Sequence, residues 1–438
     1  MNPANQIRLL LSAYQCGPAM GSVSQIGWEW YRRLSRSAHV TLLTHVRNRA
    51  ALEAAGAPYG DSEIIFVDTE WFARPLYRFA SRIFAGSEYA AFMISSLDFF
   101  VYESAALRIL KQRIAAGARW DIVHAVTPVT RMAASRLYRV GAPLILGPLN
   151  NGLPIPPGFD TILRGDHPWL YQIRRLGAAA DAIFGSTRRA AAILTATRAT
   201  LDGIPRRARS RCIPMLENGV DLDLFASAPW PPAPSTLAPL QILFVGRLQP
   251  FKALSLLLDA LAIVRNDFPI RLTVIGDGPM KAVWQAQAER LALGAVVEFQ
   301  GARELTEVAS AMRAAHVLCL PSVRESGGSV LLEAMAAARP VIAIAFGGPA
   351  EIVDDAVGRA IPPAGVEATV AGIAEALRDI VNDPDSWRRR GEEGRRRAQS
   401  RFSWDAKIDR ALELYRKLSA HRAVARTTSD LLRFEAGR

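Results

Sequence analysis

The chain has 438 residues, of which 50% are hydrophobic and 21% are charged. This balance excludes an intrinsically disordered chain, and the length favours two or three domains. Lysines and arginines number 53 against 41 aspartates and glutamates, so the formal net charge is +12. An excess of positive charge favours an anionic partner, which leaves nucleic acid, an anionic membrane surface or small anionic ligands open.

Three cysteines, Cys16, Cys212 and Cys319, lie far apart in the sequence. Their spacing argues against a disulfide framework and a structural zinc site, and it fits a reducing compartment. The apolar run at residues 7–11 is too short for the core of a signal peptide. No stretch reaches the roughly 20 apolar residues that span a bilayer. We therefore expect a cytoplasmic protein, soluble or peripheral on the inner face of the cytoplasmic membrane.

The first half of the chain predicts strands that alternate with helices. The predicted strands are residues 7–12, 40–44, 64–67, 122–124, 144–146, 182–184 and 192–195. The predicted helices lie near residues 24–34 and 89–116. This alternation is typical of a parallel sheet with crossover helices.

The segment Ala228–Pro239 contains five prolines, which neither a helix nor a central strand tolerates, and it predicts a linker. After it the alternation restarts. The predicted strands are residues 243–245, 272–275, 296–299, 317–320 and 341–345. The predicted helices are residues 254–264, 281–291, 328–338, 366–381 and 404–418. Beyond about Arg422 we expect a frayed tail.

These patterns predict an α/β protein with two α/β domains joined by a proline-rich hinge. We place an N-terminal domain at residues 1–227, the linker at 228–239 and a second domain at 240–402. Residues 403–438 form a terminal helix and tail, for which Ser403 is a suitable N-cap.

A predicted strand ends at Gly246, and two cations, Arg247 and Lys252, follow it five residues apart. In parallel sheets, ligands collect at the carboxyl ends of the strands. Arg247 offers a bidentate fork for phosphate oxygens, and Lys252 adds a compact positive charge. The pair suits a diphosphate that leaves with growing negative charge, although two solvated surface cations would give the same pattern.

Two further glycine turns lie at strand ends. Gly276 and Gly278 precede a helix on the same rim as Arg247, and Gly21 with Ser22 precedes the first helix. Such turns let the backbone approach a phosphate closely. A tight structural loop explains Gly276 and Gly278 equally well.

The densest group of polar residues lies in Arg324–Glu333, just after a predicted strand. The backbone amides that would attract an anion or sugar hydroxyls at the helix start belong to Gly327, Gly328, Ser329 and Val330. Glu333 lies about one turn into the helix and tilts back toward its start. We expect Glu333 to accept two ribose hydroxyls and Glu325 to hold a second ring. A helix-capping glutamate with a solvated partner is the alternative.

His124, at the end of another predicted strand, is a candidate for proton transfer or for orienting an acceptor. A hydrogen-bonded structural histidine fits the same position. The loop Gly147–Gly152 follows the next strand and is expected to shape the cleft, because asparagine tolerates left-handed backbone.

These motifs resemble those of the retaining family 4 glycosyltransferases, which have the GT-B fold of two Rossmann-like domains facing across a cleft. The matching segments are Asn218–Asp221 with Phe225, Gly246–Arg247 with Lys252, Gly276–Gly278, Glu325–Glu333, Gly347–Glu351 and Phe402–Trp404. They cover the second half of the chain, whereas the first half matches more loosely. There, His124 with Thr127 and Gly147-Pro148 is similar to a bacterial subgroup associated with surface polysaccharides.

The resemblance implies a hexosyl or glycosyl transferase (EC 2.4) that moves a sugar from a nucleotide-diphosphate donor to a glycan or lipid-linked acceptor. Arg247 and Lys252 would hold the diphosphate, Glu333 the ribose and Glu325 the donor sugar. No metal or cofactor is expected, since the cations replace the metal. The acceptor would bind the first domain and attack from the front face with retention. The terminal helix would cross back to that domain.

The sequence departs from the family in places. Ser22 stands where many members carry a glycine, and Ala253 stands where a glycine commonly follows the lysine. Val126 stands where some members place a catalytic histidine, two residues after His124.

Aromatic and basic residues alternate in Trp71–Phe84, in a helical pattern that places Arg74, Arg78 and Arg82 on one face. This is typical of a helix that lies on an anionic membrane, and a core helix with a solvated basic face is the alternative. Similar stretches occur at residues 28–36 and 169–175. We expect peripheral docking that presents a lipid-linked acceptor.

Three other functions remain open from the sequence. A nucleic-acid-binding protein would explain the charge, but no known binding module is recognisable. A sugar-nucleotide epimerase or a phosphorylase would use the same fold, and a phosphorylase would need a cofactor lysine that we do not identify. A binder without catalytic activity is disfavoured by the intact Arg247, Lys252, Glu325 and Glu333.

Overall fold

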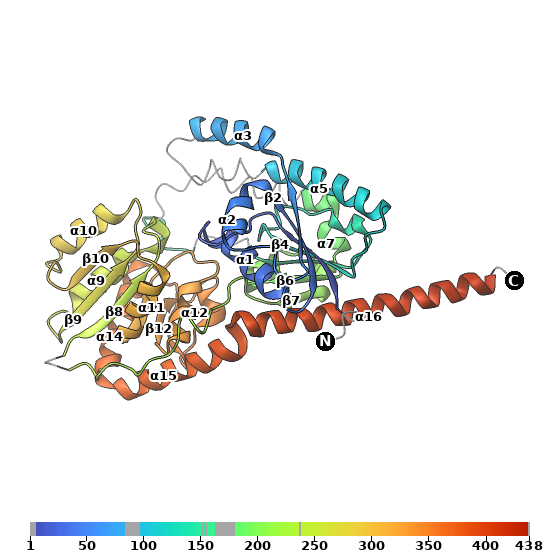
Figure 1. The fold of residues 1–438 in the computed structure, drawn as a ribbon. Helices are drawn as coiled ribbons and strands as arrows, with labels where there is room; N and C mark the ends of the chain where they lie inside the picture. The colour runs from blue at the N-terminus through green and yellow to red at the C-terminus, as the bar shows by residue number, and fades with distance from the viewer. Residues whose placement is uncertain are drawn as a thin grey trace.

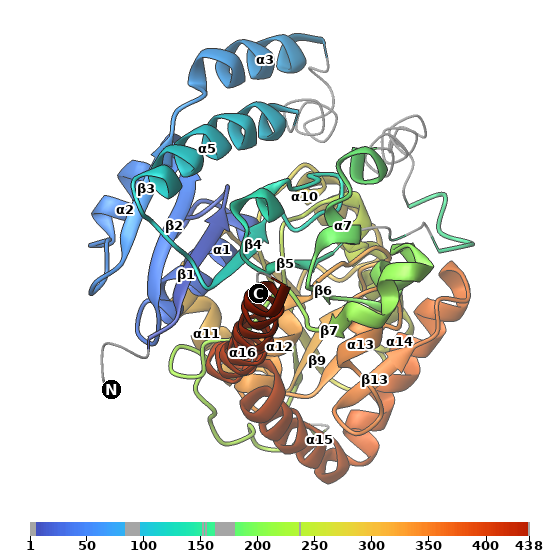
Figure 2. The ribbon, with the colours of Figure 1, turned by 90° about the vertical axis from the view of Figure 1, so that its right-hand side faces the viewer.

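The computed structural model describes residues 6–83, 97–150, 153, 156–162, 180–235 and 238–436. The side chains of Ile83 and of residues 422–436 are not part of that description. Two α/β lobes lie side by side, and a long C-terminal helix runs from the second lobe along the first (Figure 1). Each lobe has a parallel sheet between layers of helices, as Figure 2 shows from the side.

Within the described residues the first sheet has seven strands, all parallel. In spatial order they are β3 (Glu63–Val67), β2 (His39–His45), β1 (Arg8–Ala13), β4 (Ile122–Thr127), β5 (Leu144–Leu149), β6 (Ala192–Thr195) and β7 (Cys212–Pro214). The chain order reverses direction between β1 and β4, and such switch points are where α/β sheets bind ligands. β1 and β4 are hydrophobic and almost wholly buried, as expected of central strands covered on both faces.

The helices of the first lobe cover both faces of its sheet. They are α1 (Ser22–Leu34), α2 (Arg49–Ala54), α3 (Glu70–Ile83), α5 (Asp98–Ala115), α7 (Ser186–Arg189) and α8 (Arg198–Gly203). Short 3₁₀ turns are η2 (Val46–Asn48), η3 (Leu137–Val140) and η4 (Arg206–Arg211). The predicted strand at residues 182–184 is wrong, since these residues are helical. The carboxylate of Asp181 binds the amide and hydroxyl of Thr187, which favours helix there over a short apolar strand.

The second sheet has six parallel strands within the described residues. In spatial order they are β10 (Val297–Gly301), β9 (Ile270–Ile275), β8 (Leu240–Val245), β11 (Val317–Leu320), β12 (Val341–Ile344) and β13 (Gly358–Ile361). Its helices are α9 (Leu254–Val264), α10 (Lys281–Arg290), α11 (Leu305–Ala314), α12 (Ser329–Ala336), α13 (Pro349–Ile352), α14 (Val366–Asn382) and α15 (Pro384–Arg397). A 3₁₀ turn, η5 (Pro250–Lys252), precedes α9. Hence both sheets have the doubly wound α/β architecture.

The proline-rich segment that starts at Ala228 is extended along the second lobe. Arg339, which is fully buried, donates to the carbonyls of Ala228 and Pro229. The indole of Trp230 donates to the carbonyl of His316 at 3.0 Å. The carbonyl groups of this segment therefore accept hydrogen bonds from the second lobe. Proline can take part in such contacts because it lacks a backbone N–H but keeps its carbonyl.

The last helix, α16 (Trp404–Ala436), follows a π-helical turn, η6 (Ala398–Phe402). Its buried residues Trp404, Ile408 and Tyr415 belong to the hydrophobic core of the first lobe. The helix continues to Ala436, and the fraying expected beyond Arg422 stays a prediction. In the described residues, no helix is both long enough and apolar enough to cross a membrane.

Candidate functional site

Lys252 and Glu325 are in contact at the carboxyl ends of β8 and β11. The ammonium of Lys252 donates to a carboxylate oxygen of Glu325, and the other oxygen accepts the amide of Gly328 at 3.3 Å. Both side chains are mostly buried. Burial raises the pKa of Glu325, but Lys252 and the amides of the loop outweigh it, so the net shift is downward. Glu325 is therefore a carboxylate at neutral pH.

The glycines at the ends of β8 and β9 allow two backbone segments to touch. A Cβ at Gly276, whose φ is +141°, would lie 2.0 Å from the carbonyl oxygen of Gly246. A Cβ at Gly278 would likewise lie 2.6 Å from the carbonyl oxygen of Leu248. These glycines are required by packing between the two strand ends. Close packing of the backbone is therefore enough to explain why glycine occupies both positions, without a ligand contact.

The loop before α12 is built from glycines for the same reason. Gly328 has φ +58° and precedes the first residue of the helix, Ser329. Gly327 and Val330 are buried on either side of it. The helix begins with no side-chain cap, so its first amides have no capping side chain, while the amide of Gly328 just before it donates to Glu325. A helix start of this kind favours an anion.

Glu333 lies about one turn into α12 and is partly buried. Burial raises its pKa to about 7, against the opposing influence of Lys252 and of a hydrogen bond from Ser329. Glu333 is thus close enough to Lys252 to feel its charge. Arg247 follows β8 on the same rim, with an exposed side chain. The structure therefore brings Lys252, Glu325 and Glu333 together, with Arg247 beside them at the end of β8.

A cavity of ≈590 Å³ lies between the two lobes. Ser22, at the start of α1, lines it from the first lobe, and Ser329 and Glu333 line it from the second. Gly21, just before α1, has φ +97° and is exposed. The approach of this turn to a phosphate, which the sequence suggests, stays a prediction.

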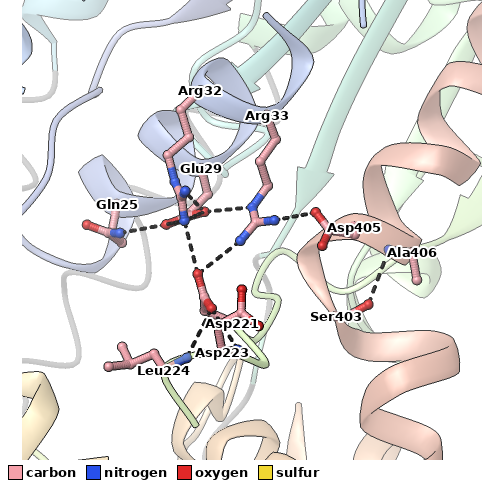
Figure 3. Close-up of polar contacts among 10 residues, drawn as sticks. All are labelled: Gln25, Glu29, Arg32, Arg33, Asp221, Asp223, Leu224, Ser403, Asp405 and Ala406. Atoms are coloured by element: carbon pink, nitrogen blue, oxygen red, sulfur yellow. Dashed lines mark hydrogen bonds and ion pairs between the residues drawn. The ribbon is translucent and has the colours of Figure 1, made fainter. Parts of the chain in front are cut away.

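A cluster of charged side chains joins the lobes beside the cavity (Figure 3). Asp221, in the Asn218–Asp221 motif, accepts from Arg32 at 3.2 Å and from Arg33 at 3.0 Å, both on α1. Arg33 also pairs with Asp405 in the first turn of α16. Burial raises the pKa of Asp221, but the amides of Leu224 and Asp223 and the two arginines lower it overall. The cluster ties three segments that are far apart in the sequence.

Both ring nitrogens of His124 are hydrogen-bonded inside the protein. It is fully buried, its Nε2 donates to the carbonyl of Gly147 at 2.6 Å, and its Nδ1 accepts from the hydroxyl of Tyr415 at 2.6 Å. Burial lowers its pKa to about 4, so the ring is neutral at pH 7. We therefore assign His124 a structural role in place of the catalytic role expected from the sequence, because Nδ1 binds Tyr415 of α16 and Nε2 binds Gly147 of β5.

Sequence reasoning missed a buried acid next to the site. Glu217 immediately precedes the Asn218–Asp221 motif and accepts a hydrogen bond from Asn150. The one sequence feature that could have pointed to Glu217 is its position next to the Asn218–Asp221 motif. The spacing of residues there does not predict that its carboxylate is buried. Of the loop expected at Gly147–Gly152, Asn151 and Gly152 lie outside the described residues.

No group of three or more His, Cys, Asp or Glu side chains that could hold a metal ion occurs in the part of the chain that the structure describes.

Comparison with known proteins gives a family. The sequence pattern of the family described as "Glycosyl transferases group 1" matches residues 234–397. The chain is 37% identical over 184 residues to a "D-inositol 3-phosphate glycosyltransferase" of Streptomyces coelicolor, which is 40% of this chain and 39% of that protein. A second such protein, from Kineococcus radiotolerans, matches at 36% over 52% of its length. The chain thus spans about half the length of these relatives.

A longer match covers both lobes. The chain is 32% identical over 322 residues to an "Alpha-maltose-1-phosphate synthase" of Mycolicibacterium smegmatis, covering 68% of this chain and 79% of that protein. Among solved structures, Anabaena Alr3699/HepE in complex with UDP matches with a TM-score of 0.62 at 16% identity, over 94% of this chain and 100% of that one. WaaG matches with a TM-score of 0.59 at 17% identity, over 93% and 99%. The structural matches show the fold alone, and with the longer sequence match they establish that the chain belongs to the group 1 (family 4) glycosyl transferases and has the GT-B fold.

Proposed function

We propose that the protein is a retaining glycosyltransferase that moves a sugar from a nucleotide-diphosphate donor to a glycan or lipid-linked acceptor in cell-surface polysaccharide biosynthesis. The observation that carries the proposal is the contact between Lys252 and Glu325 at the start of α12, with Glu333 one turn away. A cation, a helix N-terminus and two acids around one rim suit a sugar diphosphate.

Each group has a role in the proposed reaction. Lys252 and Arg247 hold the diphosphate, whose negative charge grows as the bond from the sugar C1 to the phosphate oxygen breaks. Glu333 accepts ribose hydroxyls, and Glu325 accepts hydroxyls of the transferred sugar. The acceptor hydroxyl forms the new bond to C1 on the same face, and its proton passes to the leaving phosphate oxygen. The ammonium of Lys252 has three N–H donors, so it can contact Glu325 and a phosphate together.

Relatives and structural neighbours support the donor class and the pathway. The Anabaena structures were determined with UDP and with UDP-glucose. WaaG is described as "a glycosyltransferase involved in lipopolysaccharide biosynthesis", and a matching sequence from Mycobacterium tuberculosis is described as a "Phosphatidyl-myo-inositol mannosyltransferase". We extend a nucleotide-sugar donor and a lipid-linked or glycan acceptor to this chain on that basis.

We further propose that the first lobe docks on an anionic membrane through α3. Trp71 is 71% exposed, Phe79 60% and Tyr77 59%, although large aromatic side chains are usually buried. Arg74, Arg78 and Arg82 are exposed on the same helix. The helix lies at the outer edge of the first lobe beside α5 (Figures 1 and 2). Aromatic side chains among arginines suit the interface of an anionic bilayer. Phe84 and residues 169–175, part of the sequence expectation, lie outside the described residues.

Co-flotation with vesicles tests this docking. Vesicles that contain about a third anionic lipid should carry the protein upward at low salt, and neutral vesicles should not. A variant with Trp71→Ser and Phe79→Ser should stay at the bottom of the gradient. An absence of binding to anionic vesicles at low salt would remove the membrane proposal and leave the transfer reaction untouched.

The transfer reaction is tested with UDP-, GDP- and ADP-sugars and a bacterial lipid extract as acceptor. We expect one donor to yield nucleoside diphosphate in amounts that depend on the extract, together with a labelled lipid or glycan. Conversion of the donor to another nucleotide sugar without acceptor would instead identify an epimerase. An electrophoretic shift of nucleic acid that persists in high salt would favour a nucleic-acid-binding protein.

A further inference from the structure

Glu217 is a buried acid beside the residues that we propose for the donor. It is 4% exposed and lies in the segment that leads from β7 to the second lobe. Its Oε1 accepts a hydrogen bond from the side-chain amide of Asn150. In the described part of the chain its Oε2 has no hydrogen-bond partner, and neither has the Oδ1 of Asn150. Buried acceptors without partners destabilise a fold, so this position calls for a functional reason.

Gly327, in the loop before α12, packs directly on this carboxylate. A Cβ at position 327 would stand 2.3 Å from Glu217 Oε1 and 2.2 Å from Asn218 Nδ2. A Cβ there would force the ends of the Glu217 and Asn218 side chains to move, so the glycine lets the loop lie directly against them. The same loop carries Glu325, whose carbonyl accepts the amide of Gly348 at 2.9 Å. The loop thus packs against Glu217 at Gly327 and is hydrogen-bonded to Gly348 at Glu325.

Glu217 also faces charged groups from two other elements. Lys407, buried on α16, donates to the carbonyls of Leu216 and Asn218, on either side of Glu217. Burial raises the pKa of Glu217 to about 7, Asn150 and Lys407 oppose the shift, and the carboxylate of Glu325 adds to it. Burial lowers the pKa of Lys407. Glu217 is therefore the point at which the first lobe, the terminal helix and the donor loop meet.

We propose that Glu217 is a positioning residue of the donor site, which holds the backbone of Gly327, and through it Glu325, against Asn150 of the first lobe. The inference rests on the proposed function. Glu217 acts through the loop and does not touch the donor. Because Glu325 is assigned to the sugar ring, whereas Lys252 and Glu333 are assigned to the diphosphate and ribose, loss of Glu217 should weaken recognition of the sugar more than recognition of the nucleotide.

The test compares two ligands that differ by the sugar. Thermal shift first selects the best donor among UDP-glucose, GDP-mannose and ADP-glucose for the wild-type protein. Isothermal titration then measures the affinity for that nucleotide sugar and for its nucleoside diphosphate. We expect Glu217→Ala to lose about 10- to 100-fold in affinity for the nucleotide sugar, since small displacements of a binding loop have effects of that size. The nucleoside diphosphate should lose less than about threefold.

Matched variants separate positioning from folding. Glu217→Gln keeps the acceptor for Asn150 and the volume against Gly327, so it should keep the wild-type ratio of the two affinities. Asn150→Ala removes the partner on the first lobe and should reproduce the Glu217→Ala ratio, which provides the test if Glu217→Ala does not fold. Glu103→Gln, a buried acid that pairs with Arg136 far from the donor loop, should lower stability and leave the ratio unchanged.

The outcomes distinguish this inference from the function on which it rests. If Glu217→Ala and Asn150→Ala lose affinity equally for both ligands, or lose none, the positioning role is overturned and the proposed function stands. If the wild-type protein binds none of the three nucleotide sugars, the proposed function fails, and the positioning role fails with it.

Discussion

The ammonium of Lys252 lies against the carboxylate of Glu325, although 73 residues separate the two in the chain. The pairing of β8 with β11 in the second sheet brings their carboxyl ends together, which explains the contact. Each side chain balances the charge of the other in a mostly buried position. A ligand that enters here meets a cation and an acid already held in place.

Lys252→Ala should remove most of the donor turnover and leave the fold intact. Removal of a contact to a leaving group typically lowers the rate by about 10²–10³-fold. Glu333→Ala should have a comparable effect through loss of the ribose contact. The measurement is kcat/KM for donor consumption, with circular dichroism as the check on folding.

Lys281→Ala is the matched control for these variants, because Lys281 is a partly exposed lysine that pairs with Asp277 on the same rim. It should turn over the donor at close to the wild-type rate. Wild-type turnover in both Lys252→Ala and Glu333→Ala would refute the assignment of the donor site.

Donor affinity should depend on pH through Glu333. Burial raises its pKa to about 7, and the ionised form is the one that accepts two ribose hydroxyls. Affinity should therefore rise as the pH increases toward 7 and level off above it, with a loss of up to about tenfold for each pH unit below. Glu333→Gln should bind weakly with little pH dependence in that range. The same steep dependence in Glu333→Gln would assign the titration to another group.

Stability should show the opposite dependence on pH. A carboxyl group whose folded pKa is raised holds its proton longer in the folded state than in the unfolded state. Glu333 therefore contributes stability below its unfolded pKa, and this contribution is lost as the pH rises through about 7. Glu333→Gln should gain free energy of unfolding relative to wild type between pH 5 and pH 8, as urea titrations at each pH would show. A constant difference over that range would contradict a raised pKa.

Tyr415→Phe should lower stability without changing catalysis. The variant leaves Nδ1 of the buried His124 without its donor, which costs about 1–3 kcal/mol. Turnover should remain within about twofold of wild type, because the histidine is neutral and is not among the residues that line the cavity. If turnover falls by more than the loss of folded protein explains, and the pH profile of turnover changes, His124 would be a catalytic residue after all.

Asp221→Asn should weaken the connection between the lobes. The variant keeps the acceptor for the amides of Asp223 and Leu224 and loses the charge that pairs with Arg32 and Arg33. We expect a loss of about 1–2 kcal/mol in the free energy of unfolding. Asp405→Asn is the matched control, since its side chain is 73% exposed and it should lose less. Equal losses of stability in the two variants would contradict the claim that Asp221 contributes more than Asp405 to the connection between the lobes.

The sequence predicts five of the six strands of the second lobe because they are short apolar runs bounded by glycine, proline or polar residues, whereas β13 and α11 are missed. The predicted helix at residues 254–264 and strand at residues 317–320 have the observed bounds. The strand expected at residues 182–184 fails because an apolar run of three residues does not distinguish a strand from one turn of helix. There the hydrogen bonds of Asp181, which periodicity does not report, favour the helix.

The candidate site is only partly predictable for a similar reason. Glycines and charges at strand ends point to Lys252, Glu325 and Glu333, because the ends of parallel strands meet at one rim. Whether a polar residue at a strand end faces the cavity or the core depends on what packs over it. Tyr415 on a distant helix occupies one nitrogen of His124, and Asn150 binds Glu217. These contacts depend on tertiary structure and leave no local pattern.

A thermal-shift comparison of wild type with Lys252→Ala against UDP-, GDP- and ADP-sugars tests the central claim most directly. A ligand at about 100 times its dissociation constant adds about 2.7 kcal/mol to the free energy of unfolding. We predict that at least one of these nucleotide sugars raises the midpoint of wild type and leaves that of Lys252→Ala nearly unchanged. If none of them stabilises wild type, or if both proteins are stabilised equally, then Lys252 and its acidic neighbours do not form a donor site.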